Sequence, residues 1–341
     1  MSAIADLFPG YFAMVMATGI VSVAAFLMDM SAIAWALLVI NIFAYLVLLS
    51  MTVVRVVRYF SRIADDFSDS ARGPGFFTLI AGTCVLGSQL LIVAEWERAA
   101  FVLWLFGGVL WAVIMYWFFA RATVKEHKPP IEKGISGSWL IAAVSTQSIS
   151  VLGTLLSPGY DAHHEHILFF TTSMFLIGCM LYLLLITLIF YRFTFFEFTT
   201  AALAPPYWIN MGAVAITTLA GARLIVAAPG SALLNELIPF LKGFTLFFWA
   251  AGTWWIPLLV VLGVWRHVFK RYPVKYDPQY WGLVFPLGMY TVCTFQLSKA
   301  LAFEPLMSIP MVFIYFALLG WLLAFVGLVR QILFGSRTAP A

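Results

Sequence analysis

Long apolar runs, separated by short polar segments, occupy most of the chain. A helix that spans a bilayer needs about 20 mostly apolar residues, and ten runs of that kind can be marked along the sequence. Their approximate ranges are 9–29, 32–58, 76–94, 99–120, 138–157, 166–191, 206–227, 238–265, 280–302 and 307–334. The segments between them are too short for a soluble domain. The pattern therefore predicts an all-α polytopic membrane protein, with a single ten-helix transmembrane domain over residues 1–341.

The composition supports this class and excludes others. Hydrophobic residues make up 63% of the chain and charged residues only 10%, and the mean hydropathy is +0.99. Soluble proteins contain roughly 25% charged residues, so a soluble enzyme or a nucleic-acid-binding protein is excluded despite the net charge of +4. Cys84, Cys179 and Cys293 lie in separate apolar runs, which is typical of small buried side chains. We expect no cofactor and no metal.

The basic residues predict how the chain is oriented. If both termini are on one side of the membrane, fifteen of the 19 Lys and Arg residues fall on that side, leaving only Arg98, Arg223, Lys242 and Lys299 for the other. An excess of Lys and Arg is typical of cytoplasmic loops. We therefore expect a multi-pass protein of the bacterial inner (plasma) membrane, with both termini in the cytoplasm.

Polar residues alternate between the predicted helices. The odd-numbered helices contain 21 Ser, Thr, Asn and Gln in 105 residues, and the even-numbered ones contain 11 in 131. Polar side chains in a bilayer avoid lipid and face other helices or water. Five consecutive helical hairpins, with the odd helices in an inner ring and the even helices in an outer ring, satisfy this pattern. Packing between helices is the alternative explanation, because Ser and Thr also join membrane helices that enclose no pore.

The inner ring would give a neutral, hydroxyl-lined path with positive ends. The middle of every span lacks Asp, Glu, Lys, Arg and His, while Arg223 and Lys299 lie late in odd helices, where they would place positive charge at the outer mouth. Such a field attracts anions, although a lone basic residue at a helix end also extends to lipid headgroups. The candidate pore-lining residues are Thr18, Ser22, Thr83, Ser145, Gln147, Thr217 and Thr291.

The ninth predicted helix contains an expected kink, formed by Gly282, Pro286 and Gly288. Proline removes a backbone hydrogen bond and bends a helix. Phe285 precedes the proline and is the bulky aromatic residue at the kink. A hydrophobic constriction can gate a pore, but a buried phenylalanine is also an ordinary core residue, and the residue pattern alone leaves both interpretations open.

Four segments resemble the tellurite-resistance/dicarboxylate transporter family: FPGYFAMVMATGIVS at 8–22, APPYWINMGAVAITTLAGA at 204–222, FWAAGTWWIPLLVVLGVWRH at 248–267 and YWGLVFPLGMYT at 280–291. The family includes bacterial TehA, fungal malate and sulfite transporters, and the slow anion channels of plant guard cells. The resemblance implies a pore of five inner helices built from five hairpins, in a homotrimer with one pore per protomer. It also implies a phenylalanine that blocks the pore, which the W-x-x-x-F-P pattern places at Phe285.

These observations predict a gated channel or uniporter for small inorganic or organic anions, with a hydroxyl-lined pore occluded by Phe285. The alternative is a secondary transporter of oxyanions or dicarboxylates such as malate, sulfite or tellurite, possibly coupled to protons. An enzyme is not expected, because no cluster of His, Asp or Cys lies at one membrane depth. The short segment from Asp161 to His166 is expected to be a solvated loop. The sequence does not identify the physiological anion.

Overall fold

The computed structural model describes residues 2–334, and within this range the chain is helical and contains no β-strand. The predicted all-α class is confirmed. A helix occupies each of the ten predicted ranges, and short helices α1 (Ser2–Ala5), α4 (Phe60–Ser68) and α7 (Ile131–Gly134) precede or follow them. Arg337, one of the fifteen basic residues counted on the cytoplasmic side, lies outside the described residues.

Five of the long helices, each preceded directly by a 3₁₀ turn, are mostly buried, and we call them the inner helices. Four of these turns carry Pro at their first or second position, where its fixed φ suits a helix start and no N–H is lost. The inner helices, each with its turn, are η1 (Pro9–Phe12) with α2 (Ala13–Leu27), η2 (Gly73–Phe76) with α5 (Phe77–Ala94), η3 (Gly137–Leu140) with α8 (Ile141–Leu156), η6 (Pro205–Trp208) with α10 (Ile209–Ala227), and η9 (Pro278–Tyr280) with α12 (Trp281–Leu301).

Each inner helix is followed directly by a longer outer helix that packs against it. The outer helices are α3 (Ser31–Arg58), α6 (Glu97–Val124), α9 (His164–Phe195), α11 (Ala232–Val264) and α13 (Ser308–Phe334). Three of the connections turn through a non-glycine residue with positive φ, namely Asp29, Glu95 and Ala302. A left-handed residue at this position ends a helix abruptly, so the chain reverses direction within a few residues.

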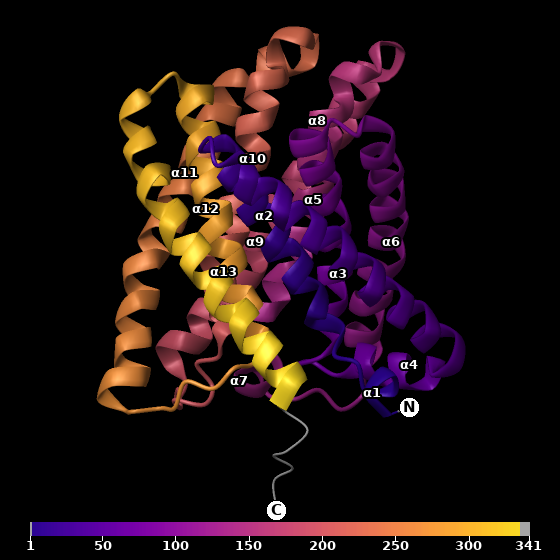
Figure 1. The fold of residues 1–341 in the computed structure, drawn as a ribbon, viewed down its shortest axis with the longest axis vertical. Helices are drawn as coiled ribbons and strands as arrows, with labels where there is room; N and C mark the ends of the chain where they lie inside the picture. The colour runs from indigo at the N-terminus through magenta and orange to yellow at the C-terminus, as the bar shows by residue number, and fades with distance from the viewer. Residues whose placement is uncertain (1, 335–341) are drawn as a thin grey trace, which may run out of the picture.

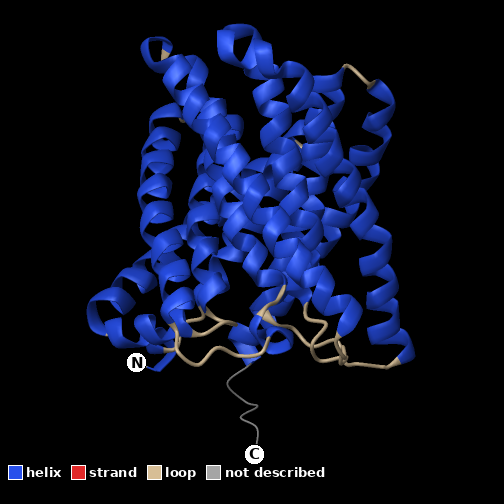
Figure 2. Cartoon of the chain, turned by 180° about the vertical axis from the view of Figure 1, so that it is seen from behind, coloured by secondary structure: helices blue, strands red, loops and turns tan. Residues whose placement is uncertain are grey.

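The inner helices close a ring. α2 packs against α5, α5 against α8, α8 against α10, α10 against α12, and α12 against α2, and the outer helices surround them (Figures 1 and 2). Among residues 2–334, nine helices are long and apolar enough to cross a membrane. Among these, the four inner ones are 72–94% buried over their most apolar stretch and the five outer ones only 22–39%. The outer helices therefore present their apolar side chains to lipid.

Helix α12 is not among those nine, although it belongs to the ring. Its second half contains Thr291, Thr294, Gln296, Ser298 and Lys299, and these polar residues lower its mean hydropathy. Within residues 2–334, the number of helices long and apolar enough to cross a membrane is thus one fewer than the ten spans predicted from the sequence.

Aromatic side chains of the outer helices join each hairpin to the next. Each donates or shares a hydrogen bond with an inner helix of the following hairpin, and α13 does so with the first. The five pairs, with their donor–acceptor distances, are Tyr45 OH with Thr83 Oγ1 (3.0 Å), Trp111 Nε1 to Thr146 Oγ1 (2.8 Å), Tyr182 OH to the carbonyl of Asn210 (3.3 Å), Trp249 Nε1 to Thr294 Oγ1 (3.0 Å) and Trp321 Nε1 to Thr18 Oγ1 (2.9 Å). We call these five hydrogen bonds the hairpin links.

A buried ion-pair cluster holds the first residues of the chain against α3 and α4. Asp66 accepts hydrogen bonds from Arg55 Nη2 (2.7 Å) and Arg72 Nε (2.6 Å). Arg55 also donates to the carbonyl of Ala5, and Arg72 to that of Leu7. The bond with Asp66 raises the pKa of Arg72 further above its ordinary value. Helices α1 and α4 and the end of α13 lie at the same end of the molecule (Figure 1), which we call the basic end.

We expect Asp66→Asn to lower the free energy of unfolding by about 3 kcal/mol, because it leaves the buried Arg55 guanidinium without its carboxylate. Asp65→Asn is the matched control, since Asp65 is exposed on the same helix. Thermal unfolding in detergent, followed by tryptophan fluorescence, measures both. Equal midpoints for the two variants would contradict a structural role for the cluster.

Candidate functional site

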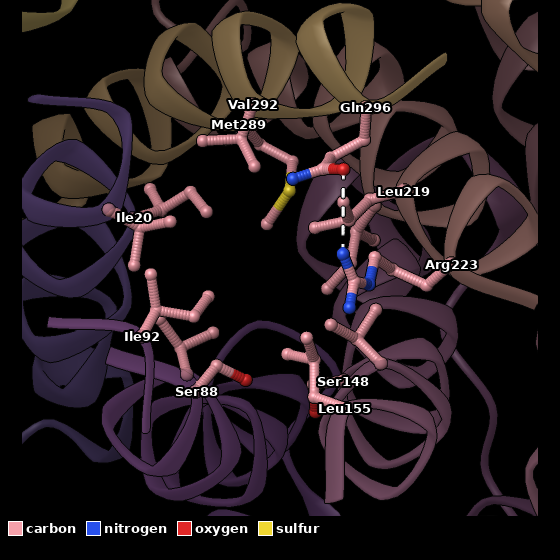
Figure 3. A pocket seen from close by; sticks show the side chains of 14 residues that line it. Ile20, Ser88, Ile92, Ser148, Leu155, Leu219, Arg223, Met289, Val292 and Gln296 are labelled. Atoms are coloured by element: carbon pink, nitrogen blue, oxygen red, sulfur yellow. Dashed lines mark hydrogen bonds between the residues drawn. The ribbon is translucent and has the colours of Figure 1, made fainter. Parts of the chain in front are cut away.

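The axis of the helix ring contains a cavity to which all five inner helices contribute (Figure 3). Its wall consists of three residues from each of α5, α8, α10 and α12, and two residues from α2. We call it the central cavity. Most of its wall is aliphatic, and its polar side chains are Ser88, Ser148, Arg223 and Gln296. The remaining lining residues are Ile20, Val23, Val85, Ile92, Val151, Leu155, Ile216, Leu219, Met289 and Val292.

Arg223 provides the charge in this cavity. Its side chain enters from α10, and Nη1 lies 3.5 Å from Gln296 Oε1 of α12 (Figure 3), which is at the long limit for a hydrogen bond. Its Nε is buried and has no hydrogen-bond partner. Within residues 2–334, the only ion pairs are those of Asp66 and one between Arg62 and Asp6, so no carboxylate neutralises Arg223.

The two serines of the central cavity bond to their own helices. Ser88 Oγ donates to the carbonyl of Cys84 (3.0 Å), and Ser148 Oγ donates to the carbonyl of Ser145 (2.7 Å). These bonds satisfy the hydroxyl hydrogens within the protein. Each oxygen still lies in the cavity wall, where the hydroxyl can rotate toward a ligand.

A second cavity, which we call the vestibule, lies at the starts of the five inner helices. Its wall includes the basic residues Arg72, Lys133 and Arg192 and no Asp or Glu. The 3₁₀ turns pack closely here: a Cβ on Gly75 would lie 2.8 Å from the backbone nitrogen of Gly10. Five helix N-termini, each with a partial positive charge, therefore meet at the vestibule. Both the basic side chains and the backbone make it electropositive.

Along every inner helix, the residues that line the two cavities are about two turns apart, and one turn of residues lies between them. On each helix, the first residue that lines the central cavity follows the vestibule residue by seven positions. The pairs are Ala13 and Ile20, Thr78 and Val85, Ile141 and Ser148, Ile209 and Ile216, and Gly282 and Met289. We call the turn between them the separating layer; its residues, three and four positions after the vestibule residue, are Met16, Ala17, Ala81, Gly82, Val144, Ser145, Gly212, Ala213, Phe285 and Pro286.

Phe285 is the largest side chain of the separating layer and is 1% exposed. Gly282, predicted at the kink, lines the vestibule instead. Pro286 packs on α10, because a Cβ on Gly212 would lie 2.7 Å from its Cγ. Gly288 packs on α2, where a Cβ would lie 2.9 Å from the side chain of Ile20. The predicted kink residues therefore hold α12 against its two neighbours in the ring.

The seven hydroxyl and amide residues predicted to line a pore do not line either cavity. Four of them bond to outer helices. Thr18 and Thr83 accept or share hairpin links, Ser22 Oγ donates to the carbonyl of Ala34 (2.7 Å), and Gln147 Nε2 donates to the carbonyl of Phe175 (3.0 Å). Ser145, Thr217 and Thr291 donate to carbonyls of their own helices.

Arg223 and Lys299, the two residues predicted at the outer mouth, have different surroundings in the structure. Arg223 lines the central cavity, whereas Lys299 is exposed and lies over the ring of Phe295, 4.3 Å from its centroid. Sequence reasoning did not select Ser88, Ser148 or Gln296. The seven-residue spacing from the last vestibule residue of α8, Ile141, was the signal that could have identified Ser148.

The segment from Asp161 to His166, expected to be a solvated loop, forms the 3₁₀ turn η5 (Asp161–His163) and the first turn of α9. Within residues 2–334, no group of three His, Cys, Asp or Glu side chains could hold a metal ion. Glu165 instead accepts hydrogen bonds from Ser231 Oγ (2.8 Å) and the backbone N–H of Ala232 (3.0 Å). Its carboxylate therefore lies at the start of α11, where negative charge is favourable.

Comparison with known proteins gives a consistent result. The family described as SLAC1, voltage-dependent anion channel, matches residues 6–329. An uncharacterized membrane protein of Mycobacterium tuberculosis (strain H37Rv) is 37% identical over 154 residues, which cover 45% of this chain and 77% of that protein. Two uncharacterized transporters of Methanocaldococcus jannaschii are 26% and 25% identical, covering 86% and 87% of this chain and 85% of each relative.

We expect Thr18→Val to destabilise the protein by about 1–3 kcal/mol, because the buried Trp321 N–H loses its acceptor. Thr187→Val is the control, since the Thr187 hydroxyl is exposed and bonds only within α9. Thermal unfolding compares the stabilities of the two variants. Anion flux, measured with each substitution added to a variant that conducts, such as Phe285→Ala, measures permeation. A Thr18→Val protein with wild-type stability and altered permeation would instead place Thr18 in the pathway.

Proposed function

We propose that this chain, which belongs to the voltage-dependent anion channel family, is a gated channel or uniporter for small anions. The resemblance seen in the sequence is confirmed by the family match and by the related transporters. The chain is thus a multi-pass membrane protein of a family of anion channels and transporters. The pathway, the gate and the selectivity proposed below are finer statements about this chain.

One observation carries the proposal: two cavities lie in register along the axis of the helix ring, separated by one turn. All five inner helices contribute to both cavities at the same seven-residue interval. A chance void between packed helices would not involve every helix at equivalent positions. We propose that the vestibule, the separating layer and the central cavity form a single path.

The charges along this path favour anions. Arg72, Lys133 and Arg192 line the vestibule, Arg223 lines the central cavity, and neither wall contains Asp or Glu. A cavity lined by one sign of charge within low-dielectric walls concentrates the opposite ion, and positive rings are typical of anion pores. Cations would meet repulsion at both cavities.

Phe285 is our proposed gate. The other nine residues of the separating layer are smaller, and five of them are Gly or Ala on the helices that face α12 across the ring or beside it. A large aromatic ring among small side chains closes a narrow path, and its removal would leave an opening that the neighbours cannot fill. Pro286 keeps the gate next to α10 by its contact with Gly212.

Membrane placement follows from the same arrangement. We propose ten spans in five hairpins. Helix α12 crosses the membrane as a member of the inner ring, where its polar residues are shielded from lipid. The basic end would face the cytoplasm, as the excess of Lys and Arg indicates. The homotrimer and the bacterial inner membrane implied earlier remain part of this proposal, since the outer helices offer extensive apolar faces to lipid or to other copies.

Two cavities with a closed layer between them would also serve a carrier for oxyanions or dicarboxylates. The names of the two Methanocaldococcus jannaschii relatives, uncharacterized transporters, agree with this second candidate. A carrier predicts saturable uptake of malate or sulfite that a protonophore reduces. A channel predicts current that reverses near the anion equilibrium potential.

We expect Phe285→Ala to raise anion current on the order of tenfold or more, equivalent to lowering the barrier by at least ~1.4 kcal/mol. Purified protein in planar bilayers, with chloride or nitrate salts, measures the current and its reversal potential. Phe295→Ala is the matched control, because it removes the same volume from the same helix outside both cavities. Silence of a folded Phe285→Ala protein would refute the gate.

A further inference from the structure

The central cavity contains a positive charge without a counter-ion. Arg223 points from α10 into the cavity (Figure 3), its Nε has no partner, and no carboxylate of residues 2–334 lies within ion-pair distance of it. Its single hydrogen bond, to Gln296, is long. A guanidinium in an apolar cavity is costly unless an opposite charge or several acceptors surround it. By contrast, Arg55 and Arg72 both have Asp66.

Gln296 adds an oriented donor to the same space. Arginine only donates hydrogen bonds, so the Gln296 atom that faces Arg223 is the amide oxygen Oε1. The amide nitrogen Nε2 is thereby directed away from Arg223, toward Met289 at the cavity wall (Figure 3). Among the hydrogen bonds of residues 2–334, the one that the Gln296 side chain makes is that of its oxygen with Arg223. The guanidinium and the amide thus present free N–H groups from two neighbouring helices.

We infer that the central cavity holds one monovalent anion when the pore is closed, bound by Arg223 and by the Gln296 amide nitrogen. The bound anion supplies the missing counter-charge and accepts the unused N–H groups. The hydroxyls of Ser88 and Ser148 lie in the same wall and can rotate to donate to it. The inference rests on the proposed path, because the resting anion would lie on that path, on the opposite side of the separating layer from the vestibule.

The wall of the cavity defines the class of anion. Ten of its 14 lining residues are aliphatic side chains or methionine, so an anion that enters must lose most of its water. This costs least for a weakly hydrated anion, and one fixed positive charge neutralises one negative charge. Bromide and nitrate therefore fit, and nitrate also matches the planar guanidinium. Sulfate, with two charges and strong hydration, would keep an uncompensated charge.

The test uses the whole protein in detergent and the anions themselves as probes. Ligands that bind the folded state raise the unfolding temperature with saturation. We expect sodium nitrate and sodium bromide to raise the wild-type midpoint saturably. Sodium sulfate at equal ionic strength should give no saturable rise, because its general stabilising effect grows steadily with concentration. The absence of a saturable rise with nitrate and bromide would overturn the inference.

Three variants assign the effect to the site. Arg223→Met should raise the apparent dissociation constant for nitrate roughly tenfold or more, as expected for loss of a charged hydrogen-bond donor. Gln296→Glu should supply an internal carboxylate, so that the midpoint becomes high and independent of nitrate even if Arg223→Met folds poorly. Lys299→Gln, which changes an exposed charge on the same helix, should respond like wild type.

A wild-type nitrate response in Arg223→Met or in Gln296→Glu would refute the site. Binding and conduction can fail separately. A conducting Phe285→Ala protein whose wild-type parent shows no anion-dependent stability would reject the resting anion and keep the channel. A silent Phe285→Ala protein with nitrate-dependent stability in the wild type would keep the site and reject the gate.

Discussion

A polar group inside an apolar membrane is costly unless it finds its hydrogen-bond partner within the protein, because lipid offers none. The hairpin links show how this chain meets that constraint. At each of the five junctions a Trp or Tyr of an outer helix bonds to the inner helix of the next hairpin. Four of these aromatic side chains, Tyr45, Trp111, Tyr182 and Trp321, are themselves buried, and their polar atoms are directed at the inner helices. This arrangement holds five otherwise separate hairpins in one closed ring.

The same constraint explains why the ring axis is so apolar. Most hydroxyls of the inner helices satisfy a backbone carbonyl or an outer-helix donor, and few polar side chains remain for the axis. Those that do remain are concentrated in the central cavity, where Arg223 and Gln296 face each other from α10 and α12. On the proposed path, the basic residues of the vestibule and Arg223 of the central cavity would favour anions, and the largely aliphatic wall of the central cavity would favour anions that lose water easily.

The sequence predicted which of the long helices are buried, whereas its pore-lining residues stay a prediction. The alternation of polar content between odd and even helices distinguishes buried from lipid-facing helices, because it averages over some twenty residues of each helix. It does not say which side of a buried helix faces the axis. Thr18 and Thr83 were assigned to the axis on residue type, and they bond to α13 and α3 instead. One hundred degrees of rotation about a helix separates these outcomes, and residue type alone does not report it.

The sequence by itself determined the membrane class, the all-helical fold, the family, and the positions of Phe285 and Arg223 on their helices. Apolar run length, the excess of basic residues and a local motif carry that information, since each is a property of contiguous residues. Only the tertiary structure decided that Gly282, Phe285 and Met289 fall in the vestibule, the separating layer and the central cavity. It also decided that Arg223 meets Gln296 but no carboxylate. These relations depend on the rotation and depth of five helices that are distant in sequence, and packing sets both.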